Sequence, residues 1–204
     1  MNVLAIGAHP DDIEYGCGGT LTLYAQKGHA VYLFVATNGS RGGRATIRRR
    51  EQEHSKVVMG ARRVFWGGYS DTELPYDRKL IVRLEAVIQR VRPSMIFVNH
   101  PDDTHQDHRN LARAAVSATR YVPNFVFYEV PSTQGFTPNC YTNVEKVLDR
   151  KLASLEAHHS QVTKTNIEDM TILELATSCA NFRGIQARVK YAEAFQSVRL
   201  LLDI

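Results

Sequence analysis

The chain has 204 residues, and its 25 Lys plus Arg against 21 Asp plus Glu give a formal net charge of +4. This length favours one domain, and hydrophobic and charged fractions of 44% and 23% argue against collagen, coiled coil and disorder. The three cysteines (Cys17, Cys140 and Cys179) form no CxxC pair, so neither a disulfide framework nor a thiolate metal site is supported. We expect a cytoplasmic protein, because the N-terminus lacks a basic region and no stretch approaches the roughly 20 apolar residues of a membrane span.

The first 130 residues alternate between short apolar runs and helical stretches. Apolar runs of this length are typical of buried parallel strands, and the alternation predicts right-handed crossovers between them. The predicted strands are residues 3–7, 30–36, 63–66, 95–98 and 125–130, and the predicted helices between them are 18–26, 48–59, 80–91 and 106–121. The expected fold class is therefore α/β, with a mainly parallel five-strand sheet flanked by helices.

The pattern changes after residue 130. Residues 131–142 are turn-rich, and the remaining apolar spacing predicts helices over 144–159, 167–180 and 185–198. No composition break marks a second domain. We therefore expect a single domain over 1–204, with a core at 1–130 and a mostly helical C-terminal extension at 131–204.

Two polar clusters follow predicted strands. His9-Pro10-Asp11-Asp12 comes directly after the first strand, and the cluster from His100 to His108 follows the fourth. In doubly wound sheets these two strands are neighbours, and ligands bind at the carboxyl ends of the strands. We expect the clusters to face each other.

Together the clusters offer imidazoles and carboxylates but no thiolate. Zn²⁺ accepts such donors, and a catalytic zinc site uses three protein ligands plus water. Surplus groups could supply a general base and an oxyanion donor, which a metal-dependent hydrolase needs.

Several ordered motifs resemble the PIG-L/LmbE-like family of zinc-dependent N-acetylglucosaminyl deacetylases. Ala8-His9-Pro10-Asp11-Asp12 with its following glycines is similar to the first motif of that family, and His105-Gln106-Asp107-His108 to its His-x-Asp-His motif. Further similarities are Arg48 to Glu51, Ala157 to Gln161, and Tyr191 to Phe195. The resemblance implies a Rossmann-like fold and hydrolysis of an N-acetylated amino sugar.

The resemblance also implies roles for individual residues. His9, Asp12 and His108 would bind the zinc ion, with Fe²⁺ as an alternative metal. Asp11 would be the general base, His105 would stabilise the oxyanion or protonate the leaving amine, and Asp107 would orient a histidine. Arg48 would lie near the substrate, and the partner implied is a small molecule, with a homo-oligomer as a further expectation.

Two positions depart from the family pattern. Gln106 stands where many members have Pro, and the loop Thr37-Asn38-Gly39-Ser40 lacks the acidic residue of the Thr-x-Gly-Glu type. Because this loop would line the mouth of the site, the second departure bears on the identity of the substrate.

Structural interpretations of the same residues remain open at this point. Asp11 and Asp12 could cap a helix, and Asp107 could complete a capping box begun by Thr104. His100 and Asp102 are interpreted as loop residues, His159 as a core histidine and His158 as a candidate on the substrate side. The basic run from Arg41 to Arg50 is either a solvated helix face or an anion-binding surface.

Two rival functions use the same residues. Two histidines and a carboxylate also suit non-haem Fe(II) enzymes. A non-catalytic module that binds an anion or nucleic acid is the other rival, but the sequence contains no recognised nucleic-acid motif. The function predicted from the sequence is a zinc-dependent N-deacetylase.

Overall fold

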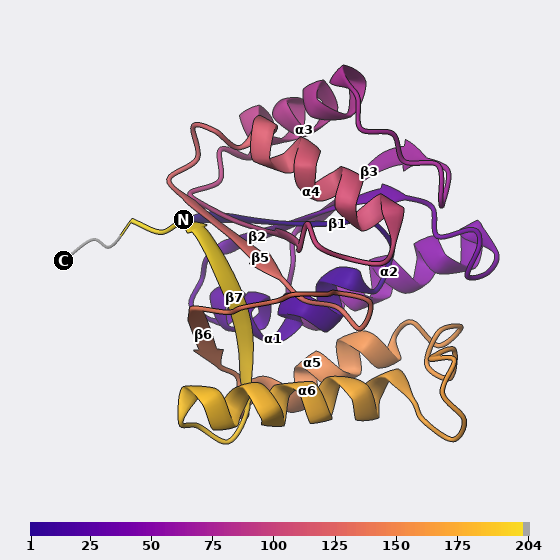
Figure 1. Ribbon diagram of the computed structural model, residues 1–204, viewed down its shortest axis with the longest axis vertical. Helices are drawn as coiled ribbons and strands as arrows, with labels where there is room; N and C mark the ends of the chain where they lie inside the picture. Colours follow the sequence, from indigo (N-terminus) through magenta and orange to yellow (C-terminus); the bar gives the residue numbers. More distant parts are fainter. Residues whose placement is uncertain (202–204) are drawn as a thin grey trace.

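A mostly parallel sheet is the centre of the computed structural model, which describes residues 1–201. In these residues the sheet has seven strands in the order β3-β2-β1-β4-β5-β7-β6 (Figure 1). Neighbours from β3 to β5 pair in parallel, whereas β7 is antiparallel to both β5 and β6. The strands are β1 (Asn2–Gly7), β2 (Ala30–Thr37), β3 (Arg63–Tyr69), β4 (Met95–Asn99), β5 (Asn124–Tyr128), β6 (Cys140–Asn143) and β7 (Ala192–Arg199).

Helices cover both faces of the sheet. One face carries α3 and α4, and the other carries α1, α2 and α5, with α6 packed outside α5 (Figure 1). Each face has its own buried apolar cluster: Leu80 and Leu84 belong to the first, Ile13 and Leu21 to the second. The helices are α1 (Asp12–Gln26), α2 (Ala45–Met59), α3 (Arg78–Val91), α4 (Gln106–Ala118), the 3₁₀ turn η1 (Glu145–Val147), α5 (Leu148–Glu156) and α6 (Ile172–Ala187).

The predicted α/β class and the parallel pairing of β1 with β4 are confirmed. The sheet has two strands more than predicted. Residues 185–198 were predicted as a helix, which is wrong: α6 ends at Ala187, Arg188 adopts a left-handed conformation (φ 61°), and β7 follows. Strand β7 lies between β5 and β6 and pairs with both. This pairing outweighs the helical preference that the local spacing of its residues suggested.

The strands β1 and β4 separate at their carboxyl ends, where a side-chain network bridges them. Asn99 accepts a hydrogen bond from the backbone of Ala8 through Oδ1 (3.0 Å), and Tyr128 donates its hydroxyl to Ile6 O (2.9 Å). Helix α1 passes so close to Tyr128 that a Cβ on Gly16 would lie 2.0 Å from the ring. The glycines of α1 therefore serve close packing at this point.

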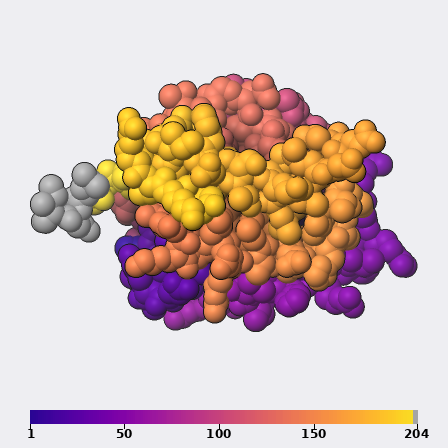
Figure 2. All heavy atoms as spheres, turned by 90° about the horizontal axis from the view of Figure 1, so that it is seen from below, coloured from indigo at the N-terminus to yellow at the C-terminus, as the bar shows by residue number. Residues whose placement is uncertain are grey.

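A buried ion pair fastens the C-terminal region to α1. Lys151 Nζ lies 2.5 Å from Glu193 Oε1, and both side chains are buried. Glu193 accepts hydrogen bonds from the backbone N–H groups of Gly19 (2.8 Å) and Thr20 (2.7 Å). Figure 2 shows the orange-to-yellow C-terminal segment spread over the indigo N-terminal region that it holds.

Among the described residues, the helices are all too short or too polar to cross a membrane.

Candidate metal centre

Two short connections, β1–α1 and β4–α4, bring the candidate ligands together. His9 follows β1, Asp12 is the first residue of α1, and His108 lies in the first turn of α4, which follows β4. Since β1 and β4 pair directly, the two helices begin at the same edge of the sheet. The topology alone thus places residues from distant parts of the chain side by side.

The donor atoms of His9, Asp12 and His108 form a compact triangle. His9 Nδ1 lies 3.1 Å from His108 Nε2, while Asp12 Oδ2 lies 3.3 Å from His108 Nε2 and 3.5 Å from His9 Nδ1. A tetrahedral zinc shell with bonds of about 2.0–2.1 Å separates its ligand atoms by about 3.3 Å. The three side chains therefore fit a first-row divalent cation.

Carboxylates contact the outer nitrogen of each histidine. His9 Nε2 lies 3.1 Å from Asp71 Oδ1 and 3.2 Å from Asp107 Oδ2, and His108 Nδ1 lies 3.1 Å from Asp103 Oδ2. Such contacts fix the ring and the tautomer, leaving the inner nitrogen free to ligate.

Other donor sets overlap this triangle. His9 lies within 4.8 Å of ligand atoms from His105 and His108, and likewise of Asp71, His105 and Asp107. We favour the triangle, because the carboxylates already engage His9 Nε2, and His105 Nδ1 accepts a hydrogen bond from the backbone of Asp107 (3.1 Å).

The electrostatics of the triangle suit a cation. Burial alone lowers the pKa of His9, but hydrogen bonds to Asp107 and Asp12 raise it well above its usual value. Burial likewise opposes protonation of His108, whereas Asp12 raises its pKa to about 9. Burial opposes ionisation of Asp12, yet His108 holds its pKa well below its usual value. The carboxylates thus surround positions where positive charge is favoured.

Asp11 lies beside the triangle in a strained conformation. Asp11 occupies the N-cap position of α1, but its φ of 93° is in the left-handed region and its side chain makes no capping hydrogen bond. Arg48 Nη2 lies 3.2 Å from Asp11 Oδ2 and also donates to Pro10 O. Burial raises the pKa of Asp11, and Arg48 opposes this shift.

His105 caps α4, meets the His9 ring edge-on and stacks on the His108 ring. Its ring centroid lies 4.5 Å from that of His9 and 4.9 Å from that of His108. Burial and the neighbouring His9 lower its pKa. Because Nδ1 accepts the Asp107 N–H, the neutral ring carries its proton on Nε2. His105 is therefore a neutral hydrogen-bond donor next to the triangle.

Asp107 connects three segments. It accepts hydrogen bonds from the backbone N–H groups of Thr72 (2.8 Å) and Leu74 (3.2 Å) and contacts His9. The predicted capping box with Thr104 is wrong, since His105 is the cap of α4 and Thr104 bonds to Ser132 O. Burial opposes ionisation of Asp107, but His9 lowers its pKa.

An open cavity of about 350 Å³ gives access to these groups. Its walls contain the triangle, Asp11, Asp71 and His105, and Arg41, Arg48 and Lys164 line it as well. Part of the basic run thus faces the site, whereas Arg49 and Arg50 lie outside this cavity. Gln106, which replaces a common Pro, donates to Thr72 O (3.2 Å) and fits without disturbing the loop.

The second His-Pro-Asp-Asp string has a different role. His100 is buried and its Nε2 lies 2.8 Å from Gln196 Oε1, whereas Asp102 is exposed. Asp103, which contacts His108, was not predicted. Asp71, two residues after the end of β3, was also missed.

The two histidines after α5 differ in burial, and only the prediction for His159 is wrong. His159 is exposed, so its interpretation as a core residue is wrong, while His158 is buried 3.5 Å from Glu14 Oε1. His158 also lines a recess of about 100 Å³ together with Asp11. The reason is that α5 ends at Glu156, earlier than predicted, and the following turn directs His158 inward.

Comparisons with known proteins agree with this geometry. Residues 4–119 match the PIG-L family, described as GlcNAc-PI de-N-acetylase. The chain is 36% identical to the uncharacterized deacetylase YaiS of Escherichia coli, over 78% of this chain and 90% of that protein. It is 30% identical to diacetylchitobiose deacetylase of Thermococcus kodakarensis, over 78% of this chain and 69% of that protein. The N,N'-diacetylchitobiose deacetylase structure from Pyrococcus horikoshii superimposes with a TM-score of 0.86 and 26% identity, covering 97% of this chain and 83% of the other.

Proposed function

The chain belongs to the PIG-L family, and we propose that it is a metal-dependent hydrolase that removes the N-acetyl group from an N-acetylglucosamine-type amino sugar or a conjugate of one. The observation that carries this proposal is the triangle of His9, Asp12 and His108 with the carboxylate of Asp11 beside it. The names of the related deacetylases support the same reaction class.

The donor set favours zinc. Two imidazole nitrogens and one carboxylate oxygen make a three-ligand site with room for water and substrate, and Fe²⁺ accepts the same donors. When bound, the metal would polarise the acetyl carbonyl and acidify a water molecule.

Asp11 is the proposed general base. Its side chain is 27% exposed and lines the cavity that holds the triangle, so it can reach a water molecule there. As that water attacks the acetyl carbon, Asp11 takes its proton. Arg48 holds the carboxylate in place through a hydrogen bond to Asp11 Oδ2.

His105 is the proposed oxyanion donor. The tautomer set by its backbone contact places the proton on Nε2, which can donate to the carbonyl oxygen as negative charge develops. The C–N bond then breaks, and the proton held by Asp11 passes to the amine. The products are acetate and a free amino sugar.

Asp107 is the proposed positioning residue for His9. By accepting two backbone N–H groups it is fixed relative to the β3–α3 loop, and its contact with His9 Nε2 directs Nδ1 inward. Asp103 does the same for His108.

Acetate release tests the proposal. Metal-loaded and chelator-treated protein would be incubated with N-acetylglucosamine, N,N'-diacetylchitobiose and other N-acetylglucosaminyl conjugates. We expect acetate and free amine in equal amounts from at least one compound, with loss of the activity on chelation and recovery on adding Zn²⁺. Activity that survives complete metal removal would contradict the mechanism, and oxygen consumption coupled to turnover would indicate an Fe(II) enzyme instead.

A further inference from the structure

A recess beside the metal centre contains a buried histidine that the proposed mechanism does not use. His158 is 1% exposed, and neither of its ring nitrogens has a hydrogen-bond partner among residues 1–201. Buried polar atoms nearly always find a partner, either in the protein or in ordered water. The two nitrogens therefore indicate that water or a small ligand binds next to this ring.

The recess also borders the proposed general base. His158 and Asp11 line it together, with apolar walls from Val130, Leu155 and Ile172. Asp11 lines the metal cavity as well, so its side chain is shared by the two spaces. The volume of the recess is about 100 Å³. One water molecule takes about 30 Å³, so the recess has room for a few waters, whereas complete ligand sites begin at roughly 300 Å³.

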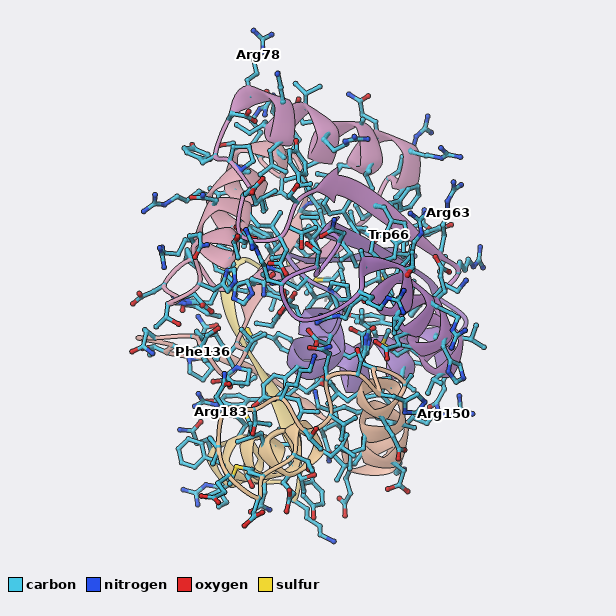
Figure 3. All side chains as sticks on the ribbon, turned by 90° about the vertical axis from the view of Figure 1, so that its right-hand side faces the viewer. Arg63, Trp66, Arg78, Phe136, Arg150 and Arg183 are labelled. Carbon is cyan, nitrogen blue, oxygen red and sulfur yellow. The ribbon has the colours of Figure 1, made fainter. Side chains whose placement is uncertain are left out.

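Helix α2 holds the turn that carries His158. Ser160, two residues further on, donates to the Glu51 carboxylate from its backbone N–H and from Oγ, each at 2.7 Å. The preceding helix α5, marked by Arg150 in Figure 3, is fastened to α2 where Arg150 donates to Val58 O (3.3 Å). The same helix carries the arginine that contacts the proposed base, so the histidine and this arginine are held by one rigid element.

Glu14 orients the His158 ring. Nε2 lies 3.5 Å from Glu14 Oε1, an oxygen that already accepts hydrogen bonds from Gln52 Nε2 (2.5 Å) and Ser55 Oγ (2.7 Å). The two nitrogens lie on different sides of the ring, so Nδ1 is directed away from Glu14. Burial lowers the pKa of His158, but Glu14 and Asp11 raise it above its usual value. The protonated ring carries an N–H group at both nitrogens.

Asp11 needs more than one contact to fix its direction. Its backbone is left-handed and its side chain makes no capping hydrogen bond, so only its neighbours orient the carboxylate. The contact with Arg48 uses Oδ2, which leaves Oδ1 to a second donor. Each carboxylate oxygen offers two lone pairs. Oδ1 can therefore accept a hydrogen bond from the recess and still take a proton from the metal cavity.

We propose that His158 is a positioning residue for Asp11: Nδ1 donates to a water molecule in the recess, and this water donates to Asp11 Oδ1. Together with Arg48, the water bridge holds the carboxylate at the metal cavity. His158 itself touches neither the substrate nor the metal. The role rests on the proposed deacetylase function, because it acts through the proposed base.

A high-resolution crystal structure of the Zn²⁺-loaded protein tests the bridge directly. We expect an ordered water within about 3.2 Å of both His158 Nδ1 and Asp11 Oδ1. In His158→Leu, which has a similar volume but no donor, the Asp11 carboxylate should turn or lose this water. A dry recess in the wild-type protein, or an unchanged water and Asp11 in the variant, would overturn the proposal.

Two amide variants separate this role from a structural pairing with Glu14. An Asn amide reaches the place of Nδ1, whereas a Gln amide reaches the place of Nε2. We expect His158→Leu and His158→Gln to lower kcat about tenfold, with KM and zinc content unchanged, because the base is misplaced but the site is intact. His158→Asn should retain most of the wild-type kcat.

The exposed neighbour His159 supplies the control, and His159→Gln should change neither kcat nor KM. If His158→Gln were active and His158→Asn were not, pairing with Glu14 would explain the histidine and the water bridge would be wrong. A fall in zinc content and stability in all three His158 variants would likewise make the residue structural and overturn the proposal.

The two proposals fail differently. If the wild-type protein releases no acetate from any compound, the deacetylase proposal is wrong and the positioning role falls with it. If the wild type is active, Asp11→Asn is inactive and His158→Leu keeps the wild-type kcat, the base assignment stands and only the role of His158 is wrong.

Discussion

Two buried charged clusters in this molecule differ in how their polar atoms are satisfied. The ion pair of Lys151 and Glu193 is closed: Lys151 also donates to the backbone oxygens of Glu14 and Tyr15, and Glu193 accepts two backbone N–H groups. In the metal centre, by contrast, two histidine nitrogens and a carboxylate oxygen converge on one point. A closed cluster holds elements together, whereas converging donors indicate a place for a cation.

The largest expected effect is the loss of turnover when the proposed general base in the candidate metal centre is removed. Asp11→Asn keeps the shape of the side chain but cannot accept the proton, so we expect kcat to fall by about 10²–10⁴-fold. Metal content, measured by elemental analysis, should stay at the wild-type level because Asp11 is not a proposed ligand. A variant with wild-type kcat would contradict the assignment of the base, and lost metal would make it a ligand.

Breaking the closed cluster should instead reduce stability. Lys151→Met leaves the carboxylate of Glu193 buried without its partner, which costs about 3–5 kcal/mol. Urea denaturation would measure the loss, and metal content of the folded protein should not change.

The exposed Lys146 provides the control for that experiment. Lys146→Met should shift the free energy of unfolding by less than about 0.5 kcal/mol. The distinction between the two clusters would not hold if Lys151→Met changed the free energy of unfolding as little as Lys146→Met does. It would also fail if Lys151→Met released the metal from folded protein.

Loosening one outer contact of the metal centre should have an intermediate effect. Asp107→Asn removes the charge of one of the two carboxylates that contact His9 Nε2, so we expect the affinity for Zn²⁺, measured by chelator competition, to fall about 10–100-fold. Asp102→Asn, which changes an exposed carboxylate in the preceding loop, is the matched control and should leave the affinity unchanged. Equal affinities for all three proteins would show that Asp107 does not position His9.

Taken per unit of pH, the smallest expected effect is the change of metal affinity with pH. His108 has a pKa of about 9 in the metal-free protein because Asp12 favours its protonated form. Below that pH a cation must displace this proton, so affinity should rise with pH by roughly tenfold per unit for each proton displaced. A flat profile between pH 6 and 8 would contradict the protonated metal-free state.

The proposed ligands His9, Asp12 and His108 were predicted from the resemblance to the family, and the order of the elements explains why the structure brings them together. They lie in the segments that follow β1 and β4, and these two strands pair directly in the doubly wound topology. Asp71 and Asp103 could not be assigned in the same way. Their contacts with the histidines depend on how two loops fold over the edge of the sheet, and no periodicity encodes that.

The C-terminal region was harder to predict for a related reason. Residues 192–199 become a strand because a place beside β5 is open to them, and Glu193 points to partners on α1 and α5. These contacts join segments that lie far apart in the chain, from 42 residues for Lys151 and Glu193 to 174 residues for Gly19 and Glu193. Local spacing favoured a helix here because it carries no information about such partners.

The left-handed backbone at Asp11 has an evolutionary consequence. Glycine adopts this conformation at no steric cost, whereas any other residue there gives up some folding free energy. Selection for thermal stability alone would therefore enrich glycine at position 11, and each such clone would lack the proposed base. The aspartate at position 11 therefore costs folding free energy at the residue that we propose as the general base.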